Sequence, residues 1–79
     1  MDVTVGLRGS PSDIESCMQE VKEDLGDKYS VSRAGGAEGY AEYMIKGKDM
    51  LGFEDEQTAM RYMNAKAKTH GCSLERLGF

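Results

Sequence analysis

The side chains of this chain that are best suited to a chemical role are the carboxylates of one segment, residues 12–27 (SDIESCMQEVKEDLGD). Six acids stand there against a single base, Lys22, so the segment carries a net charge of −5, whereas the whole chain carries −4. A row of carboxylates can bind a basic protein surface, and it can occupy the place of phosphates in a nucleic-acid-binding groove. The segment is therefore a candidate partner-binding surface. Its proposed contact residues are Glu20, Glu23, Asp24 and Asp27.

The same segment has the apolar spacing of an amphipathic helix. Its apolar residues recur at intervals of three and four positions and form one stripe: Ile14, Cys17, Met18, Val21 and Leu25. On the opposite side, Glu20 lies four residues before Asp24, and Glu23 four before Asp27. Like charges at this spacing cost a helix about 0.2–0.5 kcal/mol per pair. That cost favours a function for the acids, and an ordinary solvated helix face is the alternative.

A second group of acids, Glu54 to Glu56, lies where another helix is expected to begin. The helix macrodipole attracts acids to this end and bases to the other, which explains the group without any partner. The bases toward the other end of this helix are Arg61, Lys66, Lys68 and His70. Glu54 and Glu56 are nevertheless included in the candidate contact surface.

A third candidate surface is one face of the strand predicted at residues 40–46. Tyr40 and Met44 alternate onto the same face and are more apolar than contact with solvent requires. Such residues can anchor a partner or a second copy of the chain.

The stretch from Gly39 to Tyr43 resembles the RNP1 strand of RNA-recognition-motif domains, which stack bases on aromatic side chains. Glu38 stands where that motif has a basic residue, and Glu42 stands where it has its second aromatic residue. The net negative charge of the chain would also repel the phosphates of a nucleic-acid backbone. We therefore expect no direct nucleic-acid binding.

Groups suited to catalysis or metal binding are few and scattered. The run from Arg8 to Pro11 could hold an anion, as the phosphate loops of acylphosphatases do, but a helix cap is the favoured interpretation. Cys72 lies two residues after His70 without a third, orienting group. Two cysteines and one histidine do not make a metal site. The sequence predicts no enzyme activity, no cofactor and no metal.

Length and composition predict a single soluble domain spanning residues 1–79. The chain is 39% hydrophobic and 30% charged, which is typical of a globular domain. A chain this small buries about 60–65% of its unfolded surface, so its core is thin. No signal peptide and no apolar run of membrane-spanning length is visible. Cys17 and Cys72 are too few for a disulfide framework, so we expect a cytoplasmic protein.

Hydrophobic periodicity predicts six elements in the order β-α-β-β-α-β. Strands are expected at residues 2–8, 28–34, 40–46 and 72–79. The first helix is expected from Pro11 to about Leu25, capped by Ser10 and ended by Gly26. The second is expected from Asp55, its N-cap, to Gly71, with an apolar stripe of Ala59, Met60, Met63 and Ala67. Residues 35–39 are expected to form a glycine-rich hairpin loop, and 47–52 a loop whose Met50 and Leu51 cover the edge of the core.

This order predicts an α+β fold of the ferredoxin-like split βαβ type, with an antiparallel sheet covered by two helices on one face. The other face of the sheet is expected to be open. Its predicted residues are Asp2, Thr4, Ser30, Ser32, Tyr40, Glu42 and Met44.

These features favour a non-enzymatic module that binds a basic protein. Its sharpest form is an inhibitor that mimics nucleic acid and blocks a nucleic-acid-binding complex. Phage proteins of the anti-restriction and anti-CRISPR type are similar in size and charge. The alternative is a homodimeric regulatory or small-molecule-binding ferredoxin-like domain, anchored by Tyr40 and Met44.

Overall fold

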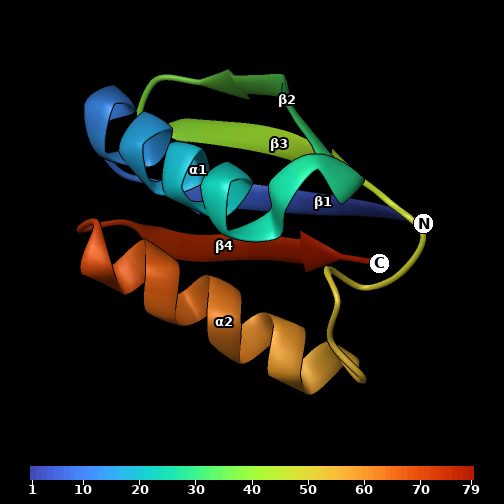
Figure 1. Cartoon of the computed structure of the whole chain (residues 1–79). Helices are drawn as coiled ribbons and strands as arrows, with labels where there is room; N and C mark the ends of the chain where they lie inside the picture. The colour runs from blue at the N-terminus through green and yellow to red at the C-terminus, as the bar shows by residue number, and fades with distance from the viewer.

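The computed structural model describes residues 1–79 and shows an α+β protein with a four-stranded antiparallel sheet and two α-helices (Figure 1). The elements are β1 (Asp2–Arg8), α1 (Pro11–Leu25), the 3-10 helix η1 (Gly26–Lys28), β2 (Ser30–Ala37), β3 (Tyr40–Lys46), α2 (Glu56–Thr69) and β4 (Ser73–Gly78). The strand order is β2-β3-β1-β4, so β2 and β4 form the two edges. Neither helix has the length and apolar character needed to cross a bilayer.

The core lies between the sheet and the helices and is built on the alternation of β1. Val3, Val5 and Leu7 face the helices and are 0% exposed, because successive side chains of a strand point to opposite faces. Val5 lies opposite Tyr43 on β3 and opposite Leu77 on β4. The predicted first strand and its inward face are confirmed.

The ends of α1 are set by the predicted caps. The Ser10 hydroxyl accepts a hydrogen bond from the backbone N–H of Asp13 (3.3 Å). Pro11 takes the first helical position, where its missing N–H leaves no bond unmade. Gly26 follows the last residue with φ 73°, and its N–H donates to the carbonyl of Lys22. The inward stripe of α1 consists of the predicted residues Ile14, Cys17, Met18, Val21 and Leu25.

The ends of α2 also follow the sequence. Asp55 accepts a hydrogen bond from the backbone N–H of Thr58 (2.7 Å), as an N-cap does. His70 closes the helix, and Gly71 turns the chain away with φ 75°. The predicted start and stop are confirmed.

The predicted apolar stripe of α2 is wrong at one residue, Met60. Ala59, Met63 and Ala67 are buried at intervals of four residues, whereas Met60 is 45% exposed. Each helical residue is rotated by about 100° from the one before it. A stripe on these three residues therefore turns Met60 to the margin of the helix, beside β4.

The predicted glycine loop between β2 and β3 is too long. β2 begins later than expected, because η1 precedes it, and it continues to Ala37. The turn consists only of Glu38 and Gly39. A Cβ at Gly36 would lie 2.5 Å from the carbonyl oxygen of Tyr40. Glycine is therefore needed for the close approach of the two strands, and it belongs to the hairpin ladder.

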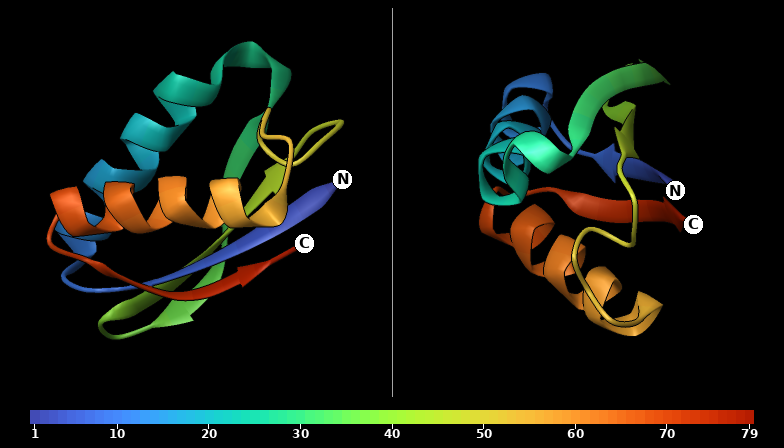
Figure 2. Two further views of the ribbon diagram at one scale, coloured as in Figure 1. Left: turned by 90° about the horizontal axis from the view of Figure 1, so that it is seen from below. Right: turned by 45° about the vertical axis from the view of Figure 1, so that its right-hand side comes forward.

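Both helices cover the same face of the sheet (Figure 2). They diverge from the end at which α1 begins and α2 finishes, and the loop of residues 47–55 runs between their other ends. Leu51 of this loop is 4% exposed and joins the core. The Phe53 ring packs on Tyr62 with centroids 5.2 Å apart. The predicted covering role is confirmed for Leu51, whereas Met50 is half-buried.

The other face of the sheet carries no helix, as expected (Figure 2). Met44 lies opposite Thr4 on one side and Ser32 on the other, so these side chains form one row. The same register places all the predicted residues on this face: Asp2, Thr4, Ser30, Ser32, Tyr40, Glu42 and Met44.

Met63→Ala and Met60→Ala form a matched test of the α2 packing. Met63 is 0% exposed, so its truncation should lower the free energy of unfolding by about 2–5 kcal/mol. Met60→Ala should change it by less than about 1 kcal/mol, because the side chain is already largely in solvent. Urea denaturation followed by circular dichroism measures both. Equal losses would contradict the observed orientation of α2.

Candidate functional site

The polar side of α1 divides into an inner and an outer line of acids. Glu20 and Asp24 turn toward α2, where they contact basic and hydroxyl groups. Glu23 and Asp27 turn to solvent and make no ion pair or side-chain hydrogen bond. The four proposed contact residues of this segment therefore do not form one surface.

The inner line forms a charged cluster with α2, here named the helix clasp: Glu20, Asp24, Tyr62, Lys66 and His70. The Lys66 ammonium lies 2.5 Å from Glu20 Oε1 and 2.7 Å from Asp24 Oδ2. His70 Nε2 lies 2.9 Å from Glu20 Oε2, and the Tyr62 hydroxyl donates to Asp24 Oδ2 at 2.8 Å. A cation thus sits between two carboxylates that would otherwise repel each other.

Helical spacing on both elements produces this arrangement. The clasp residues of α2 and those of α1 each recur at intervals of four, so each set lies on one side of its helix. The pairing between the acids of α1 and the bases of α2 was not predicted from the sequence. The matching four-residue spacing is the signal that could have identified it.

Contacts within the clasp shift the pKa values of its members. The pKa of Glu20 is lowered by hydrogen bonds from Lys66 and then from His70. The pKa of Asp24 is lowered by hydrogen bonds from Lys66 and then from Tyr62. Conversely, the hydrogen bonds to Asp24 and Glu20 raise the pKa of Lys66. Each shift favours the charged form, so the clasp is an ionic contact at neutral pH.

The outer line runs along the solvent side of α1. Glu15, Gln19, Glu23 and Asp27 follow one another at intervals of four residues and are all exposed. The first three lie on α1 about 6 Å apart along its axis, since each residue advances it by about 1.5 Å. Asp27 lies past the end of α1, in η1. We call the three acids of this row, Glu15, Glu23 and Asp27, the outer acidic line.

Glu54 and Glu56 are exposed at the beginning of α2. Glu54 is in the loop of residues 47–55 and Glu56 is the first residue of α2. This end of α2 lies at the same end of the helical layer as the C-terminal end of α1 (Figure 2). Lys28 and Lys48 border a shallow depression beside this loop. Bases therefore lie among the acids at this end of the molecule.

Tyr40 and Met44 lie on the open sheet face, but Tyr40 is engaged within the chain. Its hydroxyl donates to Glu42 Oε2 (2.7 Å), and Arg76 Nη1 donates to the same oxygen (3.2 Å). The Arg8 guanidinium lies 5.5 Å from the centroid of the Tyr40 ring, within reach of a cation–π contact. The two arginines were not predicted at this face, because their place depends on the strand order.

Tyr40 also depends on a glycine in the neighbouring strand. A Cβ at Gly6 would lie 2.3 Å from the Tyr40 hydroxyl oxygen. The phenol end of Tyr40 therefore lies in the space that a side chain at position 6 would occupy. Met44 is half-buried in the next row of the same face.

The two cysteines lack the features of an activated thiolate. Burial raises the pKa of Cys17 to about 11 and also raises the pKa of Cys72. Cys72 Sγ approaches the main-chain oxygen of His70 (3.8 Å), whereas the ring of His70 binds Glu20. No group of three or more histidine, cysteine or acidic side chains is arranged to hold a metal ion.

The run from Arg8 to Pro11 is occupied by structural contacts. Arg8 Nε pairs with Glu75 on β4, and Ser10 caps α1. These contacts agree with the favoured interpretation of this run as a turn and a helix cap.

Comparison with known proteins finds no matching family, no matching curated protein and no matching solved structure.

Replacing Lys66 by methionine should weaken the contact between the helices. The methionine keeps most of the aliphatic stem but leaves Glu20 and Asp24 without their shared cation. We expect Lys66→Met to lower the urea midpoint at pH 7 more than Lys68→Met, because Lys68 is exposed and makes no ion pair.

The effect of Lys66→Met should depend on pH. The two acids have lowered folded-state pKa values, so their stabilisation is present above about pH 5 and is lost as the pH falls toward 2. Lys66 has a raised pKa, so its contribution is present below about pH 10 and is lost at higher pH. The difference in urea midpoint between Lys66→Met and Lys68→Met should therefore disappear as the pH falls toward 2. A constant gap from pH 7 to pH 2 would contradict the ionic clasp.

Proposed function

We propose that the chain is a non-enzymatic protein-binding module that engages a basic partner through the outer acidic line of α1. The observation that carries this proposal is the division of the acids. Glu20 and Asp24 are used to hold α1 against α2, whereas Glu23 and Asp27 face solvent without partners. The clasp holds α1, which carries Glu15 and Glu23, against α2, and this lowers the entropic cost of binding.

The form of the proposal that we favour is an inhibitor that mimics nucleic acid. The carboxylates of Glu15, Glu23 and Asp27 would occupy positions that phosphates take in the basic groove of a nucleic-acid-binding protein. Complementary charge speeds encounter and selects the partner more than it adds raw affinity. Glu54 and Glu56 offer a second contact at the end of the helical layer. Glu20 and Asp24 become positioning residues in this proposal.

We also propose that the fold is of the ferredoxin-like split βαβ type. The order of elements, the strand order β2-β3-β1-β4 and the placement of both helices on one face support this assignment. A cytoplasmic location is part of the same proposal. Its support is that Cys17 and Cys72 are both free and buried, as is usual for thiols in a reducing compartment.

Affinity capture from cell lysate tests the proposed partner class. The chain should retain a basic nucleic-acid-binding protein in stoichiometric amount, and nuclease treatment should not release it. Retention should fall between about 50 and 500 mM salt, because the Debye length shrinks from about 14 Å to about 4 Å over this range. A partner that is lost on nuclease treatment, or retained equally at both salt concentrations, would contradict mimicry of nucleic acid.

Charge reversal at Glu23 and Asp27 tests the surface itself. The double variant Glu23→Lys/Asp27→Lys should bind the captured partner at least about tenfold more weakly, because it places like charges against a basic surface. The control with the same change in net charge is Asp2→Lys/Glu38→Lys, whose side chains are exposed on the open face and the hairpin turn. Both variants should keep the wild-type melting temperature within a few degrees. Equal weakening by the two variants would show that only net charge matters.

A further inference from the structure

The edge strand β2 is left uncovered by the rest of the fold. All of its residues are exposed except Val31, which is half-buried. Its only strand neighbour is β3, so the backbone groups of its outer edge have no partner in the sheet. Proteins commonly protect such an edge with proline, lysine or a covering helix. The sequence of β2 (SVSRAGGA) contains neither proline nor lysine.

The two edges of the sheet differ in their packing and not in their regularity. β4 has an irregular register opposite Gly6 and Leu7, and β2 has one between Arg33 and Gly35. α2 packs beside β4, and three residues of β4 are half-buried, whereas β2 has one. β2 is therefore the more exposed edge of this sheet.

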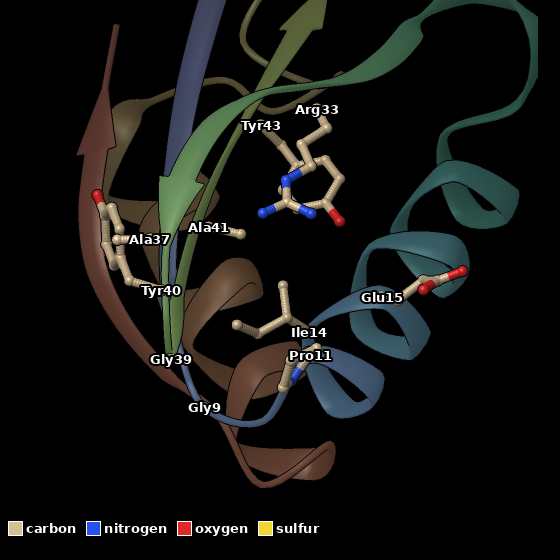
Figure 3. A pocket seen from close by; sticks show the side chains of 10 residues that line it. All are labelled: Gly9, Pro11, Ile14, Glu15, Arg33, Ala37, Gly39, Tyr40, Ala41 and Tyr43. Atoms are coloured by element: carbon tan, nitrogen blue, oxygen red, sulfur yellow. The ribbon is translucent and has the colours of Figure 1, made fainter.

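A groove lies between the β2–β3 hairpin and the beginning of α1 (Figure 3). It is small and open to solvent, with a volume of about 70 Å³. Ile14 and Pro11 of α1 form one wall, and Ala41 and Tyr43 of β3 form the other. The groove therefore combines a mixed polar and apolar lining, in which half of the residues are hydrophobic, with an adjacent unpaired strand edge.

Arg33 of β2 projects into this groove beside Tyr43 (Figure 3). Its guanidinium makes no ion pair, and its one hydrogen bond within the chain runs from Nε to the carbonyl of Gly35 at a long 3.5 Å. Glu15, the acid that borders the groove, directs its carboxylate away from it (Figure 3). The groove thus holds a cation with unused donors, which suit a carboxylate.

We infer that β2 accepts an extended segment of a partner protein as a fifth strand, with an Asp or Glu of that segment paired to Arg33. Side chains two residues from the acid would face the same side, where the lining of the groove favours apolar groups. Backbone hydrogen bonds to β2 would supply affinity, and Arg33 would supply selectivity. This surface meets the outer acidic line at Glu15 but includes neither Glu23 nor Asp27, and the inference stands independently of the proposed function.

A second copy of the chain is a poorer occupant of this edge. Two β2 strands related by a two-fold axis that keeps the helices on one side would bring both Arg33 side chains to the same face. Like charges across neighbouring strands are destabilising. An acidic segment satisfies the same edge without this repulsion.

Selection from a displayed library of random nine-residue segments tests the inference. Segments that bind the wild-type chain should alternate β-branched residues and share an acid at one fixed position. Arg33→Gln should weaken the selected peptides by about tenfold or more, since a charge-assisted hydrogen bond contributes about 1.5–3 kcal/mol. The matched control Arg61→Gln changes an exposed arginine of α2 that makes no ion pair, and it should leave binding within twofold.

Two further measurements separate strand addition from other modes of binding. The selected peptide with alternate backbone N-methyl groups should fail to bind, and amide exchange of β2 should slow in the complex. Glu23→Lys/Asp27→Lys should not weaken the peptide, so failure here is distinct from failure of the proposed function. The inference is overturned if no segment is selected, if Arg33→Gln and Arg61→Gln act equally, or if the exchange protection falls outside β2.

Discussion

The apolar layer between β1 and the two helices is the constraint on which the rest of this structure depends. A chain of 79 residues can build only one thin layer of this kind, and Val3, Val5 and Leu7 provide its base. The helices cover these side chains, and β2 lies at the edge of the sheet with only Val31 half-buried. The ion pairs between the helices involve side chains that stay partly exposed, so their charged groups remain partly hydrated.

The helix clasp changes how the acidity of this chain should be understood. A negative net charge suggests a surface available for binding, yet several acids serve the fold itself. Glu20 and Asp24 hold Lys66, while Glu42 and Glu75 hold the arginines of the open face. The unpaired charge is therefore smaller and more local than the net charge implies. On and just past α1 it belongs to Glu15, Glu23 and Asp27, which are exposed and make no ion pair, although Lys22 lies beside them.

The sequence predicted those features that are set by local chemistry. Helix caps at Ser10 and Asp55, and the alternation of β1, depend on residues close together in the chain, and each was placed correctly. The extent of the β2–β3 hairpin and the exposure of Met60 depend on how strands and helices pack, and both were misjudged. The clasp was missed for the same reason, since Glu20 and Lys66 are 46 residues apart in sequence. The four-residue spacing marks the charged stripe on each helix, but it is the topology that brings the two stripes together.

The contact of Tyr40 with Gly6 has a consequence for how this protein can change over generations. The ring occupies the space that a side chain at position 6 would need, and its hydroxyl orders Glu42 and Arg76. A side chain at position 6 would displace the phenol end of Tyr40, and with it the hydrogen bond from its hydroxyl to Glu42, unless position 40 changes as well. The two sites therefore form an epistatic pair. Divergent descendants of this chain should retain both residues or replace both together.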